Sequence, residues 1–183
     1  MSNITPKEVS ILRKNFNLGL IGIGIAGLRN CFKVKATQYP RDSLKALLQT
    51  QGYDKVGQLS FSDLKYYVAN WQDWQKIIKY EWVNKREYYS DRFDCDNFAF
   101  YFAANVAYMF NLNSAGVAYG SIYNKDTGKY INRHAFNMIV AIYEGKLQLI
   151  AYEPKKDYST LVLKGQKIIM GNWEYRPDWL FYF

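Results

Sequence analysis

Asp94-Cys95-Asp96-Asn97-Phe98-Ala99 opens the apolar run FAFYFAANVAYMF, which ends at Phe110. An acidic residue directly before such a run predicts a helix that begins near Cys95, with Asp94 as its N-cap. Unpaired amides and the macrodipole at a helix N-terminus favour the thiolate form of a cysteine placed there. His134, the only histidine, is the only imidazole available as a base. The alternative is a buried cysteine that only packs and a histidine that merely ends a strand.

The residue pattern changes from a helical period to a period of two after Asn113. This alternation predicts antiparallel strands joined by turns, at 116–124, 130–143, 147–153, 160–163 and 166–170, the last two forming a hairpin around Gly165. If the turn at Glu144-Gly145 has two residues, Tyr143 pairs with Lys146. That register places His134 on the same face as Glu153, within reach of its carboxylate.

The first half of the chain is expected to be mostly helical, with helices at 5–15, 43–52 and 61–83. Thr5 and Ser60-x-x-Asp63 are typical helix starts, and a wide aromatic stripe follows the second of these. The segment 19–27 contains Gly22-x-Gly24-x-x-Gly27, formally a dinucleotide fingerprint. Because no βαβ pattern surrounds it, we interpret it as an apolar segment for packing or assembly.

Helices first and antiparallel strands second indicate an α+β fold. We expect N-terminal helices followed by a nucleophile-bearing helix packed on an antiparallel sheet, in a single domain over 1–183. Its parts are a helical N-terminal portion, 1–87, and an α+β core, 88–183. The aromatic stretch 173–183 is expected to pack on the body as a tail.

The formal net charge of +8 comes from basic residues scattered along the whole chain. It predicts a general affinity for acidic partners, such as a wall polymer or nucleic acid, without a nucleic-acid code. Cys31 and Cys95 make no disulfide framework, which suggests a reducing compartment. The start lacks a signal-peptide pattern and the longest apolar run is too short to span a bilayer. We therefore expect a cytoplasmic or particle-associated basic protein with no transmembrane segment.

Three short motifs carry a family resemblance: DCDNFA at 94–99, HAFN at 134–137, and Tyr152-Glu153-Pro154. Their order resembles the papain-like protease domain at the C-terminus of certain fungal agglutinins and related phage and bacterial proteins. A broader likeness is to transglutaminase-like cysteine peptidases. The resemblance covers about residues 88–156 and implies a papain-like or transglutaminase-like fold.

The resemblance implies a triad in which Cys95 is the nucleophile, His134 the general base and Glu153 the orienting acid. The thiolate would attack an amide carbonyl and form an acyl-enzyme. The backbone amide of Cys95 would supply one oxyanion donor, and Trp82 and Asn84 lie in the region expected for a second.

The agglutinin-type enzymes depend on calcium, and the resemblance makes Asp91, Asp94 and Asp96 candidate calcium ligands. The alternative is that these aspartates only cap the helix and complement its dipole. Apart from this calcium, no cofactor is expected.

The function predicted from the sequence is a cysteine-dependent amide hydrolase, a thiol protease or a wall-peptide amidase, acting on a peptide or protein substrate. The alternative is a catalytically silent papain-like module with a binding or structural role, for instance in a phage particle.

Overall fold

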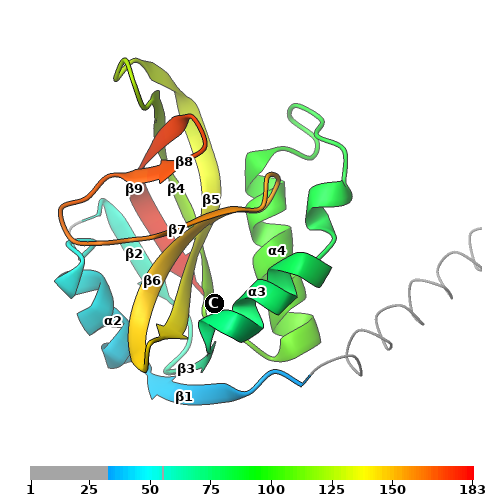
Figure 1. The fold of residues 1–183 in the computed structure, drawn as a ribbon, viewed down its shortest axis with the longest axis vertical. Helices are drawn as coiled ribbons and strands as arrows, with labels where there is room; N and C mark the ends of the chain where they lie inside the picture. The colour runs from blue at the N-terminus through cyan, green and yellow to red at the C-terminus, as the bar shows by residue number, and fades with distance from the viewer. Residues whose placement is uncertain (1–32, 55) are drawn as a thin grey trace, which may run out of the picture. The chain divides into compact units, whose positions relative to one another are not determined.

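A seven-stranded sheet forms the centre of the fold (Figure 1). The structure is a computed structural model that describes residues 33–54 and 56–183. The strand order is β2-β9-β4-β5-β6-β7, and β8 pairs with β9. The strands are β2 (Gln58–Phe61), β4 (Ala115–Asn124), β5 (Tyr130–Tyr143), β6 (Lys146–Glu153), β7 (Tyr158–Leu161), β8 (Ile168–Met170) and β9 (Trp173–Tyr182). A separate two-stranded sheet pairs β1 (Ala36–Pro40) with β3 (Lys65–Ala69).

Helices cover both sides of the large sheet. They are α2 (Arg41–Thr50), α3 (Trp71–Tyr80), the short 3-10 helix η1 (Val83–Lys85) and α4 (Cys95–Phe110). In Figure 1, α3 and α4 lie on one side of the sheet and α2 lies on the other. Leu44 and Leu48 of α2 are fully buried in the main apolar core, and Phe98 and Phe102 of α4 are buried on the opposite side. Residues 34–183 form one compact unit, while the expectation of a single domain over 1–183 stays a prediction.

The helix predicted at Cys95 is confirmed. It begins at Cys95, and Asp94 is its N-cap. The Asp94 side chain accepts from the backbone of Asn97, and the Asn97 side chain accepts from the backbone of Asp94 at 3.1 Å. This reciprocal capping satisfies amides that would otherwise lack partners at a helix start. It fixes the position at which the Cys95 side chain leaves the helix.

The predicted β5–β6 hairpin is also confirmed, together with its register. Tyr143 pairs with Lys146, and Asn137 pairs with Tyr152. The turn between them is Glu144-Gly145, with both residues at positive φ, as a two-residue hairpin turn requires. This register carries His134 and Glu153 to the same end of the two strands.

The single helix predicted over 61–83 is wrong. The segment forms the end of β2, then β3, and only then α3. In β3 the fully buried Tyr66 and Val68 flank the exposed Tyr67, which is the period of two of a strand. The real helix start is Asn70, whose side chain accepts from the Asp73 amide at 2.8 Å.

The aromatic stretch at 173–183 is not a tail packed on the body. Its residues form β9, which lies between β2 and β4 and pairs parallel with β2 and antiparallel with β4. The hairpin predicted around Gly165 is wrong as well, since β7 pairs with β6 and β8 pairs with β9. The alternation was visible in both segments, but the choice of partner strand depends on contacts distant in the sequence.

β4 changes its register with β9 between Tyr119 and Gly120. Gly120 lies opposite His134 on β5 and opposite Pro177 on β9. A Cβ atom at Gly120 would lie 2.1 Å from the carbonyl oxygen of Arg176 and 2.6 Å from Cα of Pro177. The backbones of β4 and β9 therefore approach each other closely because position 120 has no side chain.

The predicted papain-like α+β arrangement of helices followed by a sheet is wrong. More of the described residues lie in strands than in helices, and strands β1, β2 and β3 precede the helix at Cys95. The helix predicted at 5–15 and the glycine-rich segment 19–27 lie outside the described residues. Within the described part, the molecule is a mainly β structure with a few covering helices.

Candidate functional site

The structure brings His134 of β5 and Glu153 of β6 into direct contact. The imidazole Nε2 lies 2.6 Å from Oε2 of Glu153, and the two side chains are 14% and 3% exposed. Tyr175 of β9 donates its hydroxyl to the same carboxylate oxygen at 3.2 Å. The backbone amide of Lys155 donates to the other oxygen at 3.3 Å. The carboxylate is thus fixed from two more directions and holds the imidazole in one orientation.

Aromatic rings surround the imidazole. The rings of Trp173 and Tyr175 each meet the His134 ring edge-on, with centroids 5.7 Å apart. Burial alone would lower the pKa of His134, but hydrogen bonds with Cys95 and Glu153 and the charges of both groups raise it to about 9. At neutral pH the imidazole therefore carries a proton and a positive charge. Cys95, a half-buried free thiol, faces this charge.

The protonation of His134 has a measurable effect on stability. The pKa of His134 is about 9 in the folded protein, against an ordinary value of 6.5. The stabilisation is fully present below pH 6.5 and is lost as the pH rises through 9, a loss of at most about 3 kcal/mol in the free energy of unfolding. Urea unfolding between pH 6 and pH 10 measures this loss. Glu153→Gln is expected to flatten the profile, and an equally steep fall in that variant would contradict this origin.

Lys155 connects the cluster to the loop around η1. Its ammonium donates to the carbonyl oxygens of Asn84 and Arg86, at 3.1 and 2.6 Å, and lies 5.2 Å from the ring centre of Phe98. The side chain of Asn84 donates to Asp157, and Trp82 packs edge-on against Tyr101. Asn84 and Trp82, expected near a second oxyanion donor, therefore have these other partners.

The predicted calcium ligands lie around the start of α4. Asp91 occupies a turn at positive φ, and Asp96 accepts from the Asn97 amide at 2.8 Å. A hydrogen bond with Asp96 and partial burial raise the pKa of Asp94. Within residues 33–54 and 56–183, no group of three or more His, Cys, Asp or Glu side chains is placed to hold a metal ion.

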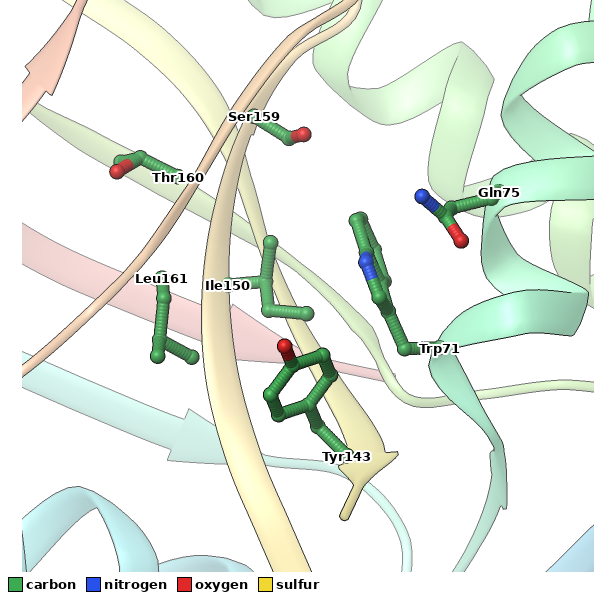
Figure 2. A pocket seen from close by; sticks show the side chains of 7 residues that line it. All are labelled: Trp71, Gln75, Tyr143, Ile150, Ser159, Thr160 and Leu161. Carbon is green, nitrogen blue, oxygen red and sulfur yellow. The ribbon is translucent and has the colours of Figure 1, made fainter.

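A separate pocket of about 300 Å³ lies between α3 and the β6–β7 edge of the sheet (Figure 2). It is lined by Trp71, Gln75, Tyr143, Ile150, Ser159, Thr160 and Leu161. In Figure 2 the indole of Trp71 stands along one side of the pocket, and the Tyr143 ring and Ile150 lie beside it. The sequence analysis missed this pocket because it placed Trp71 inside one long helix over 61–83, in the aromatic stripe expected to be core, whereas Trp71 is the first residue of α3. The run of three hydroxyl residues at 158–160, Tyr-Ser-Thr, was its one visible signal.

No protein-family model and no curated protein match this sequence. Two solved structures are similar to it. One, a complex of PSL1a with E64, has a TM-score of 0.52 and 20% identity and covers 79% of this chain and 51% of that chain. The other is Polyporus squamosus lectin bound to the human-type influenza-binding epitope Neu5Acα2-6Galβ1-4GlcNAc, with a TM-score of 0.54, 19% identity, and coverage of 79% and 49%.

The likeness shows the fold. The chain spans about half the length of the structures it matches. The expected membership of a papain-like or transglutaminase-like peptidase family is corrected by these matches, because the second of them is a lectin chain solved with a bound glycan. The predicted cysteine-hydrolase function is corrected with it. Of its alternative, the papain-like assignment is corrected, and the binding or structural role stays a prediction. These matches give no support for a peptide substrate.

In the part of the chain that the structure describes, no helix has the length and apolar character needed to cross a membrane.

Proposed function

We propose that this chain is a carbohydrate-binding protein and that the Trp71 pocket is its sugar site. The observation that carries this proposal is the composition of the pocket. One indole faces hydroxyl and amide side chains, and no charged side chain lines the space. Such a lining suits a ligand that has an apolar face and many neutral hydroxyl groups, which describes a neutral sugar ring.

The geometry fits the two faces of a sugar. The indole offers a flat apolar surface and one N–H donor, against which the C–H face of a pyranose packs. Gln75, Ser159 and Thr160 supply donors and acceptors for hydroxyl groups at the pocket wall. Small-ligand sites usually fix the orientation of the ligand with a few polar groups placed around an apolar surface. The volume of about 300 Å³ is at the small end for ligand sites, which favours a short saccharide.

The pocket is held in place before any ligand binds. Trp71 is the first residue of α3, directly after the Asn70 cap. The Asn70 amide group donates to Asp73 at 3.1 Å, and Lys76 pairs with the same carboxylate at 2.7 Å. The backbone of Asn70 also forms an isolated β-bridge with that of Ile142, near the end of β5. A preformed wall loses less conformational entropy on binding, which raises affinity.

The comparison supports the ligand class only. The Polyporus squamosus chain was solved with a sialylated glycan, and this chain shares its fold over part of its length. Binding of a saccharide by this chain is therefore proposed on the pocket itself, with the fold as support.

Trp71→Ala is expected to weaken binding of the neutral disaccharide Galβ1-4GlcNAc at least about tenfold, because the platform for the sugar ring is lost. Isothermal titration calorimetry measures the affinity. Trp82→Ala is the matched control, since Trp82 is 38% exposed and does not line the pocket. Equal affinity of Trp71→Ala and the parent protein would place any sugar site elsewhere. The absence of saturable binding to neutral saccharides would contradict the proposed function itself.

Four expectations from the sequence remain proposals. Cys95, His134 and Glu153 are proposed to form a reactive-thiol centre, supported by the contacts of His134 with the other two groups. Calcium at Asp91, Asp94 and Asp96 is tested by the change of melting temperature on adding calcium and then a chelator. A cytoplasmic or particle-associated location, and affinity for an acidic wall polymer or nucleic acid, also stay predictions.

A further inference from the structure

A second hollow, of about 540 Å³, lies between the end of α2 and strands β8 and β9. Its lining differs from that of the Trp71 pocket because it is rich in charge. Three cations and one carboxylate line it: Lys164, Lys167, Arg176 and Glu174. The net charge of the lining is therefore positive. A hollow with this balance concentrates anions near its surface.

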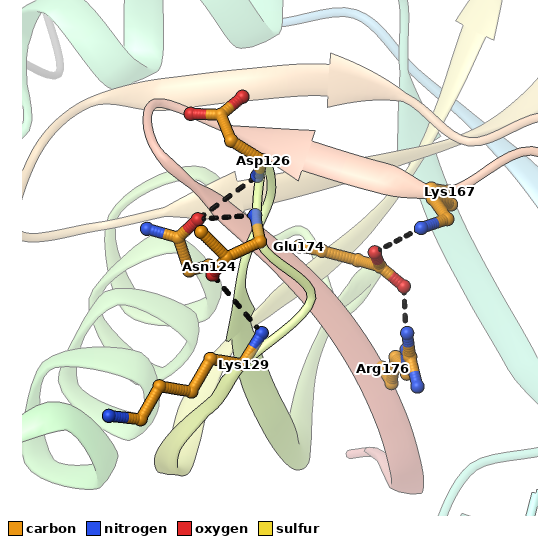
Figure 3. Close-up of polar contacts among 7 residues, drawn as sticks. Asn124, Asp126, Lys129, Lys167, Glu174 and Arg176 are labelled. Carbon is orange, nitrogen blue, oxygen red and sulfur yellow. Dashed lines mark hydrogen bonds and ion pairs between the residues drawn. The ribbon is translucent and has the colours of Figure 1, made fainter.

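Glu174 organises two of these cations (Figure 3). Its carboxylate accepts from Nε of Arg176 and from Nζ of Lys167, both at 2.6 Å. The side chain of Glu174 is 3% exposed, while those of Lys167 and Arg176 are 63% and 51% exposed. The hydrogen bonds from Arg176 and Lys167 lower the pKa of Glu174, so the carboxylate stays charged at neutral pH. A buried anion thus holds two exposed cations in fixed positions.

The cations keep donors for a ligand. Nε of Arg176 donates to Glu174, and Cζ of Arg176 lies 4.0 Å from the ring centre of Tyr123. The flat Tyr123 ring therefore orients the terminal nitrogens of the guanidinium. A guanidinium in that position suits two-point recognition of a sulfate or carboxylate. Lys164 has no ion pair among the described residues, so its full charge is available in the same hollow.

Gln51 adds a neutral acceptor at the wall. Its side-chain Oε1 is buried and has no hydrogen-bond partner among the described residues. A buried acceptor without a donor is costly, and a ligand hydroxyl would satisfy it. The end of α2 also lies here, but its last carbonyls already accept from the amides of Gln51, Gly52 and Tyr53. The negative end of the helix is therefore largely covered by hydrogen bonds.

We propose that this hollow binds an acidic saccharide. The sulfate or carboxylate of the sugar is held by Arg176, Lys167 and Lys164, and a neighbouring hydroxyl donates to Gln51. This inference deepens the proposed carbohydrate binding by naming an acidic ligand class, but it concerns a site that shares no lining residue with the Trp71 pocket. Failure at one site therefore leaves the other testable.

The test uses a sulfated heparin tetrasaccharide, inorganic sulfate and neutral Galβ1-4GlcNAc as separate ligands of the full chain. Lys164→Gln is expected to weaken tetrasaccharide binding about three- to tenfold, and Arg176→Gln more than about tenfold. Lys164→Gln leaves the Glu174 pairs intact, so it remains informative if Arg176→Gln fails to fold. Lys129→Gln is the matched control, because it removes the same charge from an exposed position in the turn after β4 (Figure 3).

The outcomes separate the proposals. Loss of tetrasaccharide binding in Lys164→Gln but not in Lys129→Gln or Trp71→Ala supports the acidic site. An equal loss in Lys129→Gln means that only general charge attracts the ligand, and the site is then wrong. Inorganic sulfate that binds as tightly as the tetrasaccharide contradicts the sugar contact at Gln51. Loss of Galβ1-4GlcNAc binding in Trp71→Ala, and in no other variant, supports the proposed function at the Trp71 pocket. That result leaves the acidic site unaffected.

Discussion

Replacing His134 with alanine is expected to slow the alkylation of Cys95 by iodoacetamide about 10- to 100-fold at pH 7. The protonated imidazole, with a pKa of about 9, places a positive charge beside the sulfur. A positive charge beside a cysteine sulfur raises the reactivity of that sulfur toward an electrophile. Removing the imidazole takes that charge away and leaves Cys95 with an acidic residue on each side in the sequence, Asp94 and Asp96.

The rate is measured by mass spectrometry of the peptide that contains Cys95. Cys95→Ser serves as the background, because it reports the contribution of Cys31, which lies outside the described residues. Glu153→Gln is expected to give an intermediate rate, since it removes the partner at 2.6 Å from His134 but keeps the imidazole. A rate in His134→Ala equal to that of the parent protein would refute the reactive-thiol centre. A reactive thiol alone does not make the protein a hydrolase.

Gly120→Ala is expected to destabilise the protein by about 3 kcal/mol or more. The new Cβ would lie 2.1 Å from the carbonyl oxygen of Arg176. Both colliding groups belong to the backbone, so no side chain can turn away to relieve the contact. The strands β4 and β9 have to separate, and Gly120 also lies opposite His134. We expect a lower midpoint in urea together with a smaller effect of pH on stability.

Gly145→Ala is the matched control for this clash. Gly145 has a φ of 74°, and a Cβ there meets no atom within 4 Å. Its replacement adds backbone strain of about 1 kcal/mol without a collision. If both variants lose the same stability, the close approach of β4 and β9 is not the cause of the loss at Gly120.

Local signals in the sequence were sufficient for some elements. Asp94 and the apolar run after it predicted α4 correctly, because capping depends on residues three positions apart. Glu144-Gly145 predicted the hairpin and its register, because a two-residue turn fixes the pairing of both strands. The contact between His134 and Glu153 follows directly from that register.

Long-range pairing could not be predicted in the same way. β9 pairs with β2 over more than a hundred intervening residues. Neither segment carries a local signal that identifies the other as its partner strand. The 61–83 error has a local cause, because Leu64, Tyr67, Val68 and Trp71 recur at helical spacing. In the structure Leu64 and Tyr67 are exposed, and burial follows the strand period at Tyr66 and Val68. The Trp71 pocket could not be predicted for the same reasons, because it forms only where α3 meets the edge of the sheet.

The position of β9 inside the sheet has a consequence for how the chain assembles during synthesis. Among residues 33–54 and 56–183, β2 has no other strand beside it in the large sheet, and it is linked to β4 only through β9. On the ribosome, β2 and β4 are therefore made long before the strand that joins them. Until residues 173–182 have been translated, both edges of β2 lack a partner strand, and unpaired edges are prone to wrong pairing with other chains. At this end of the fold, β2 is therefore synthesised first but can join the sheet only after β9, the last strand to be made.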